Sequence, residues 1–120
     1  MRGDSPSAAE LLSAMERIST QVQYIRGQGR NAFLDGDVES GVLQAATCHL
    51  IIQFQAVLDD LSTGFVDQNS DLPFAAVRGM RNRLAHGYSD IDSTLLWNTV
   101  DEALPAFLAE LVTRITPVDR

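Results

Sequence analysis

Lysine is absent from this chain of 120 residues, and cysteine occurs only once. The single Cys48 excludes an internal disulfide and favours a reducing compartment. No apolar run reaches the roughly 18 residues that suggest a membrane span. The first six residues also lack the apolar stretch of a signal peptide. We therefore expect a cytoplasmic protein with no membrane partner.

The overall charge is acidic, with a formal net value of −7. This balance argues against a general nucleic-acid coat protein, which is usually basic. It is compatible with a basic protein partner, because complementary charges guide association. Three of the nine arginines, Arg78, Arg81 and Arg83, nevertheless fall within six residues. They form either a local phosphate-binding spot or a solvated helix face.

Apolar residues recur at helical spacing, which predicts an all-α bundle of four to five helices. We expect this bundle to form a single domain over residues 8–116, after a disordered segment at residues 1–7. The first helix begins near Ser7, an expected N-cap with Glu10 as its capping-box partner. A second helix is expected over residues 38–61. Its apolar stripe is broad enough for burial on two sides, and Val42, Ala45, Ile52 and Ala56 widen it.

Residues 62–72 are expected to form a loop, after which Pro73 suits the first turn of a third long helix. Asp92 or Ser93 is expected to cap the last helix. Pro105 removes one backbone donor from that helix, so we expect a kink near Asp101.

The stretch with the clearest chemical content follows Pro73 and reads Arg81-Asn82-Arg83-Leu84-Ala85-His86-Gly87-Tyr88. Arginine binds phosphate through a planar fork of donors, and histidine exchanges protons near neutral pH. Arg81 and His86 diverge by roughly 140° on a straight helix. Gly87 favours a helix end just after His86. One copy of this helix makes a poor catalytic site, whereas two copies facing each other across a dimer axis make a better one.

No metal site or cofactor is expected from the remaining polar residues. His49 and Cys48 are adjacent on a helix and therefore point to different faces. The acidic stretch from Asp35 to Glu39 lacks the full ligand pattern of a calcium loop. We interpret that stretch as a turn followed by a helix cap.

The octapeptide resembles the R-x4-H-x-Y motif of HepT-like toxins, a branch of the HEPN superfamily of ribonucleases. The similarity extends from about Glu10 to about Ile115. The other similar segments are Glu16-Arg17-Ile18, Tyr24-Ile25-Arg26-Gly27, Phe33-Leu34, Leu72-Pro73-Phe74, Arg78-Gly79-Met80, Asp90-Ile91-Asp92 and Leu96-Trp97.

The resemblance implies a homodimeric, metal-independent endoribonuclease toxin of a type VII-like toxin–antitoxin pair. His86 would be the general acid or base, and Arg81 would stabilise the reacting phosphate of the RNA substrate. Asn82 would orient His86 or hold its own backbone turn. Tyr88 would accept adenylyl groups from a nucleotidyltransferase antitoxin of the MntA type. Arg78 and Arg83 are further candidates for RNA contact.

The chain departs from the family pattern at two positions of the second long helix. Gln55 stands where many members carry Glu, and Cys48 is the nearest match to a frequent basic residue. These departures keep open a non-catalytic helical module that binds a nucleotidyltransferase. A purely structural dimerisation bundle, with Arg81 and His86 in ion pairs, is the third possibility.

Overall fold

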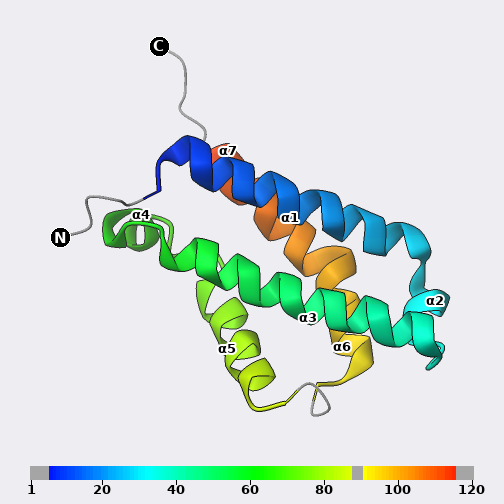
Figure 1. The fold of residues 1–120 in the computed structure, drawn as a ribbon. Coiled ribbons are helices and arrows are strands. Elements are labelled where there is room, and N and C mark those ends of the chain that lie inside the picture. The colour runs from blue at the N-terminus through cyan, green and yellow to red at the C-terminus, as the bar shows by residue number, and fades with distance from the viewer. Residues whose placement is uncertain (1–5, 88–90, 116–120) are drawn as a thin grey trace.

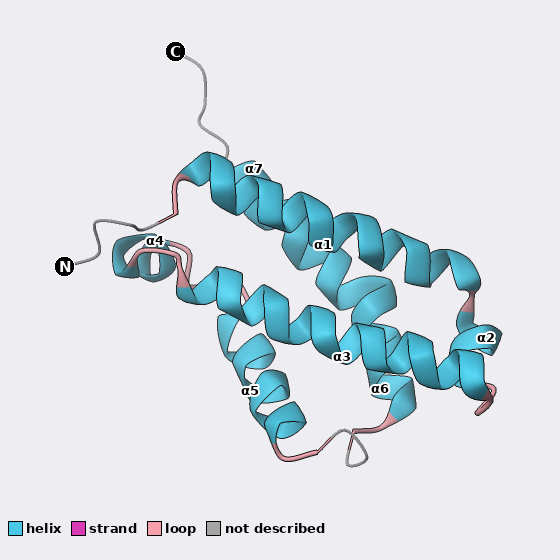
Figure 2. Cartoon of the chain, viewed as in Figure 1, coloured by secondary structure: helices cyan, strands magenta, loops and turns pink. Residues whose placement is uncertain are grey.

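Two long helices, α1 (Ala8–Gln28) and α3 (Val38–Asp59), form the frame of the molecule in a computed structural model that describes residues 6–87 and 91–115. They lie side by side, joined through the short α2 (Arg30–Leu34), and α7 (Leu104–Ile115) packs along α1 (Figure 1). Figure 2 shows helices joined by short connections and no strand in the described part of the chain. The all-α prediction is therefore confirmed.

The first helix begins as its sequence predicts. The Ser7 hydroxyl accepts a hydrogen bond from the Glu10 backbone N–H at 3.1 Å. The Glu10 carboxylate in turn accepts one from the Ser7 N–H at 2.8 Å. This reciprocal pair satisfies two backbone donors that a helix start leaves without intrahelical partners. The helix continues through Gly27 and ends at Gly29, whose φ of 92° favours glycine.

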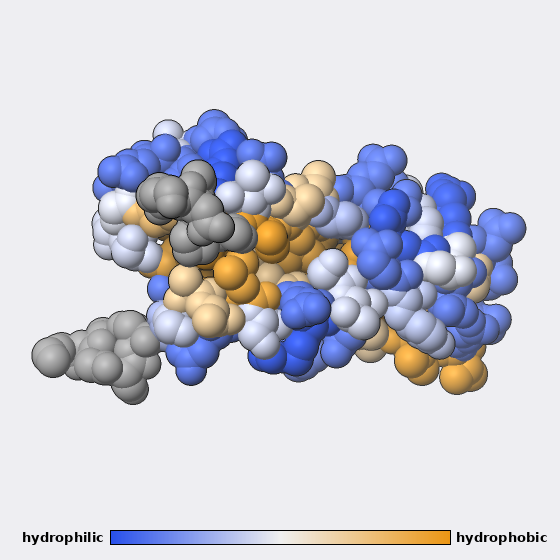
Figure 3. Space-filling view, turned by 90° about the horizontal axis from the view of Figure 1, so that it is seen from above, coloured by the Kyte–Doolittle hydropathy of each residue, from blue (hydrophilic) through white to orange (hydrophobic). Residues whose placement is uncertain are grey.

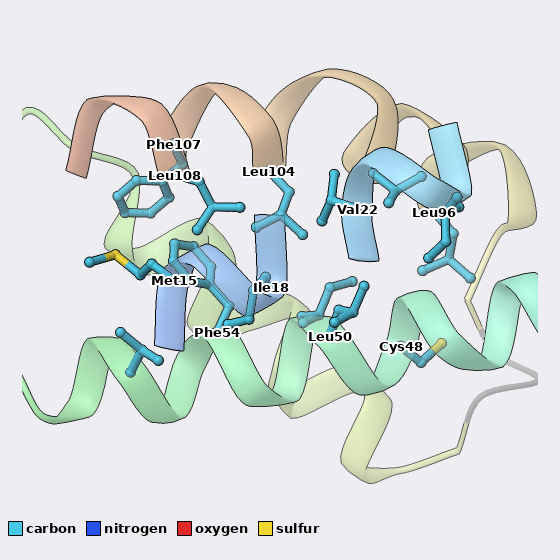
Figure 4. Packing of buried hydrophobic residues seen from close by; sticks show 14 of the residues in the cluster. Met15, Ile18, Val22, Cys48, Leu50, Phe54, Leu96, Leu104, Phe107 and Leu108 are labelled. Atoms are coloured by element: carbon cyan, nitrogen blue, oxygen red, sulfur yellow. The ribbon is translucent and has the colours of Figure 1, made fainter. Parts of the chain in front are cut away.

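The core lies where α1, α3 and α7 meet (Figure 4). All five apolar residues of the α1 repeat are buried: Leu11, Met15, Ile18, Val22 and Ile25. Phe54 of α3 packs edge-on against Phe107 of α7, with ring centroids 5.1 Å apart. The two aromatic rings therefore join the second long helix to the last one.

Pro105 interrupts the last helical segment, as expected, but through a change of helix type. The chain runs from α6 (Ser93–Asn98) through a π-helical turn, η2 (Thr99–Ala103), into α7. The Leu104 N–H donates to the Thr99 carbonyl, five residues back. Proline has no N–H to bond the carbonyl of Asp101, and the wider turn accommodates this loss. Asp92 is the N-cap of α6, and its carboxylate accepts from the Thr94 N–H at 2.9 Å.

The helix that carries the motif, α5 (Phe74–Ala85), packs against α3 and extends away from the rest of the bundle (Figure 1). Its start is fixed by Arg114 of α7, whose guanidinium forms two hydrogen bonds of 2.8 Å to the Asp71 carboxylate. Arg114 also donates to Asn69 at 2.9 Å. Phe74, the first residue of α5, contacts Phe107 at 5.6 Å between centroids. A polar clamp and an aromatic contact thus hold the same end of α5.

Two expectations about the connecting regions were wrong. Residues 62–72 contain a short helix, α4 (Thr63–Gln68), for which the Ser62 hydroxyl accepts from the Phe65 N–H at 3.1 Å. The second long helix ends at Asp59, two residues before the predicted boundary. Disorder was expected at residues 1–7, and residues 1–5 of that segment lie outside the described structure.

Much of the broad apolar stripe of α3 is not covered within one subunit. Val42 is 62% exposed, and Ala45 and Ala56 are also exposed. By length and composition alone α3 could cross a membrane, but half of its most apolar window is buried inside the fold. It is therefore the central helix of a bundle, with one neutral face left on the surface.

Candidate functional site

The candidate site lies at the C-terminal end of α5, and His86 closes that helix. His86 has φ −96° and ψ 0°, and its backbone N–H donates to the carbonyls of Arg83 and Leu84. Gly87 follows with φ 131°, a conformation that side-chain-bearing residues rarely adopt. The predicted helix end is therefore confirmed, with His86 in the C-cap position directly after the last helical residue.

The motif residues take different faces of this helix. Leu84 is buried, Arg81 is half-buried beside it, and His86 is exposed. Because His86 still has helical backbone angles, Arg81 and His86 diverge by roughly 140° around the axis. Their side chains therefore do not converge through helix geometry within one subunit.

Asn82 lies on the same outward face as His86. Its side chain makes no hydrogen bond within the described residues, either to His86 or to its own backbone turn. Neither of the two roles considered for Asn82 is therefore present in the isolated subunit. Tyr88, the candidate acceptor of adenylyl groups, lies outside the described residues, as does Asp90.

The electrostatic setting of α5 differs from that of the rest of the chain. No Asp or Glu occurs between Asp71 and Asp90, although the chain has 16 acidic residues in total. The guanidinium groups of Arg78, Arg81 and Arg83 form no ion pair with any described residue. Elsewhere, Arg114 forms salt bridges to two carboxylates and Arg26 forms one to Asp101 at 3.3 Å. The positive charges of α5 are thus available to an external anion.

A stripe of small and polar residues runs along the outward face of α5. Ala75, Gly79, Asn82 and His86 are spaced by four, three and four residues, so they fall within roughly 60° of one another. All four are exposed, and a Cβ atom added at Gly79 would meet no atom within 4 Å. The spacing of these four residues is a signal for the stripe that the predictions from the sequence did not include. The stripe allows another backbone to approach α5 closely.

The motif end of α5 does not line either of the apolar hollows formed by the described helices. One hollow lies between α1 and α7, where Figure 3 shows apolar surface bordered by hydrophilic residues. The other lies beneath α5, between that helix, α3 and the segment from η2 to α7. Enzyme sites are usually concave. A single subunit presents the motif on a projecting surface instead.

The two positions that depart from the family pattern are both buried in α3. Burial raises the pKa of the Cys48 thiol above its usual value. The amide nitrogen of Gln55 donates to the Asp59 carboxylate at 2.8 Å, while its oxygen is buried without a hydrogen-bond partner. His49, next to Cys48, is exposed, so the two side chains lie on different faces. In the regions that the structure describes, no three His, Cys, Asp or Glu side chains cluster as metal ligands.

Comparison with known proteins agrees with the motif. No solved structure matches the chain. The family model described as ribonuclease HepT-like matches residues 14–113, which include most of α1, all of α3 and α5, and nearly all of α7. A match of this extent spans most of the helical bundle as well as the motif. The chain therefore belongs to the HepT-like ribonuclease family of HEPN toxins.

Proposed function

We propose that the protein is a metal-independent endoribonuclease toxin of a type VII-like toxin–antitoxin pair, with Arg81 and His86 as its catalytic residues. The observation that carries the proposal is the acid-free motif helix, whose guanidinium groups have no intrachain partner in the described structure. In a chain of net charge −7, these groups form a local positively charged region that attracts a phosphate backbone. Arg78 and Arg83 extend the same surface and would contact RNA outside the reacting phosphate.

The reaction would be completed between two subunits. The outward stripe of α5 supports the close approach of two such helices, because its Ala75 and Gly79 are small. The exposed face of α3 supports a large interface, since residues 40–58 contain no Asp, Glu, Lys or Arg, and His49 is their one histidine. Across a twofold axis, His86 of each subunit would then lie at the contact, and the long Arg81 side chain, roughly 140° away around its helix, would reach the partner's His86 from the edge of that contact. The homodimer supplies the concavity that one subunit lacks.

In this site, His86 takes the proton from a ribose 2′-hydroxyl, whose oxygen attacks the adjacent phosphorus. The bond to the 5′-oxygen of the next nucleotide breaks, and that oxygen receives a proton. Negative charge accumulates on the phosphate oxygens as the attack proceeds, and the Arg81 guanidinium stabilises it. The products are a 2′,3′-cyclic phosphate and a 5′-hydroxyl.

The partner would be a nucleotidyltransferase antitoxin of the MntA type, which would adenylylate Tyr88. An added phosphodiester would bring negative charge beside the arginines of α5 and oppose RNA binding, by the same electrostatic logic as phosphorylation. The position of Tyr88, two residues after the His86 cap, supports this arrangement. Tyr88→Phe should still cut RNA and should no longer be silenced by the partner with ATP.

Mixing two inactive variants tests the composite site. His86→Ala and Arg81→Ala should each abolish RNA cleavage, whereas Arg17→Ala on exposed α1 should not. A heterodimer of the two inactive variants would contain one site with both residues intact if the site spans two subunits. Co-expression should therefore restore cleavage, and cleavage should survive EDTA. If the mixture stays inactive while its heterodimer is detected, the composite site is wrong.

The second candidate function is a non-catalytic module that binds a nucleotidyltransferase. The replacements at Gln55 and Cys48 favour it, because both lie in the buried part of α3. Expression of the chain alone separates the two functions. Growth arrest with cut RNA supports the ribonuclease, whereas purified dimer without any cleavage supports the binding module.

A further inference from the structure

A groove runs between α1 and α7, on the face of the molecule that Figure 3 shows from above. Its floor is formed by Met15 and Leu108, which belong to the buried core. Its walls are more open to solvent, and Val112 of α7 is 38% exposed. The remaining lining residues are Leu12, Glu16, Ser19 and Gln23 of α1 and Pro105 and Ala109 of α7. The two helices thus leave part of their shared apolar face uncovered.

The groove is long enough to hold a helix. Its α1 side extends from Leu12 to Gln23, which is about 17 Å at the rise of an α-helix. A third helix lying on α1 and α7 would therefore contact them over about three turns. The small side chains of Ser19 and Ala109 would let that helix approach closely. A helix with apolar residues three and four positions apart presents them on one face, as helix-in-groove recognition requires.

The charge that an occupant of the groove meets is negative. Glu16 is the one charged side chain in the lining, and its carboxylate has no ionic partner among the residues that the structure describes. Arg26 lies beyond the Gln23 end of the groove and is already paired with Asp101 at 3.3 Å. Arg17 lines a separate hollow, which α1 forms with α3. The carboxylate of Glu16 is therefore available to a positive group of another molecule.

The same charge argues against two other occupants. A second copy of the chain, seated groove to groove, would bring its own Glu16 toward the first, and each copy carries a net charge of −7. An anionic membrane surface would be repelled for the same reason, because such surfaces attract basic segments. A basic protein segment has neither disadvantage, since its charge complements that of the groove.

We propose that the groove between α1 and α7 binds an amphipathic helix of a protein partner, with an apolar face and at least one lysine or arginine placed to meet Glu16. Neither α3 nor α5 lines this groove. Figure 1 shows α5 on the other side of α3 from α1. The groove is thus a different surface from the one proposed for the dimer and for RNA, and the proposal does not rest on the ribonuclease function.

A synthetic peptide tests the site on the full chain. The probe is a capped peptide of about 16 residues, long enough to be partly helical by itself, with Leu and Ala on one face and Lys on the other. One control peptide carries Glu at every Lys position. Another has the same composition as the probe in an order that forms no apolar face.

Methionine methyl NMR follows the binding, because Met15 lines the groove and Met80 does not. The basic peptide should shift the Met15 signal saturably and leave the Met80 signal in place. The reordered peptide should shift neither signal. The absence of a saturable Met15 shift at basic peptide concentrations up to about 1 mM would overturn the proposal.

Two pairs of variants locate the binding and its charge dependence. Ala109→Arg places a long cationic side chain in the groove, whereas Ala106→Arg adds the same group at an exposed position of α7 outside the lining. The first should weaken binding of the basic peptide about tenfold or more, because it fills the groove and repels the lysines, and the second should not. Unchanged affinity in Ala109→Arg contradicts the site.

Glu16→Gln should weaken binding of the basic peptide about two- to fivefold, the effect expected from one exposed ion pair. Glu39→Gln removes an exposed carboxylate at the start of α3, away from the groove, and should leave the affinity unchanged. Equal affinity of Glu16→Gln and wild type would contradict the proposed role of Glu16.

Two further readouts separate the possible occupants. The acidic peptide should bind more weakly than the basic one, and the difference should shrink as salt is added, because salt screens exposed charges. Equal binding of both peptides at low salt would contradict a basic partner. Sedimentation with and without the basic peptide should give the same oligomeric state of the chain. If the peptide dissociates a dimer, a second copy covers the groove and the proposed partner is wrong.

Discussion

Replacing Gly79 by leucine has opposite expected effects on the subunit and on the proposed dimer. Gly79 lies inside α5 without a positive φ, and a Cβ added there meets open space. Glycine in a helix interior costs about 0.5–1 kcal/mol relative to alanine, and leucine is nearly as good a helix former. The variant should therefore stabilise the isolated subunit by about 0.5–1 kcal/mol.

The same leucine should weaken the dimer and RNA cleavage, because it widens the stripe on which the second α5 is expected to pack. Gly27→Leu is the matched control, since Gly27 is an exposed glycine of α1 with no atom near its added Cβ, and it lies outside the faces of α3 and α5 proposed for the dimer. Urea unfolding over a range of protein concentrations separates the subunit's own stability from the association energy. Sedimentation and cleavage then report the dimer. Unchanged association and cleavage in Gly79→Leu would refute the packing of two α5 helices.

Three further predictions concern stability and reactivity. The hydrogen bonds from the Arg114 guanidinium lower the pKa of Asp71. The interaction therefore stabilises the fold above the ordinary carboxyl pKa, and this stabilisation is lost as pH falls through the lowered pKa. In urea unfolding, the wild type should lose more stability between pH 7 and pH 3 than Asp71→Asn. Phe54→Ala should destabilise the fold by about 3–5 kcal/mol, measured by urea unfolding, because Phe54 is fully buried against Phe107. Burial and the raised pKa of Cys48 should make its alkylation by iodoacetamide slow in the native protein and fast in urea; rapid native alkylation, followed by mass spectrometry, would contradict its burial.

The helices with regular apolar spacing could be predicted from the sequence. In α1, spacings of four and three residues keep one face toward the core, and every member of that repeat is buried. The helix α4 was missed because it is only six residues long and has no buried residue. Its one local signal was Ser62, a favourable N-cap within a segment otherwise rich in turn residues.

The π-helical turn also had a signal that the sequence analysis did not use. Leu96, Val100 and Leu104 are separated by two successive steps of four residues, and all three are buried. On a regular α-helix two such steps drift by roughly 80°. The wider turn at η2 takes up this drift and returns Leu104 to the core. Pro105 alone indicated an interruption but not its form.

For the candidate site, sequence predicted the helix, its end and the residues presented there. It did not predict which apolar residues of α3 would be covered. Val42 and Ala45 belong to an apolar stripe that one subunit leaves exposed. Periodicity identifies an apolar face, but only the arrangement of neighbouring helices decides whether that face is buried within the chain or left for another molecule.

Because α5 contains three arginines and no Asp or Glu, positive charge is concentrated on this helix of an otherwise acidic subunit. Outside α5, carboxylates outnumber arginines, so an approaching polyanion is repelled by most of the surface and attracted by one end. In the proposed dimer, two such ends meet, and their unpaired arginines repel each other. Bound RNA would relieve that repulsion. Substrate binding and dimer formation would then be thermodynamically linked, each strengthening the other by the same factor.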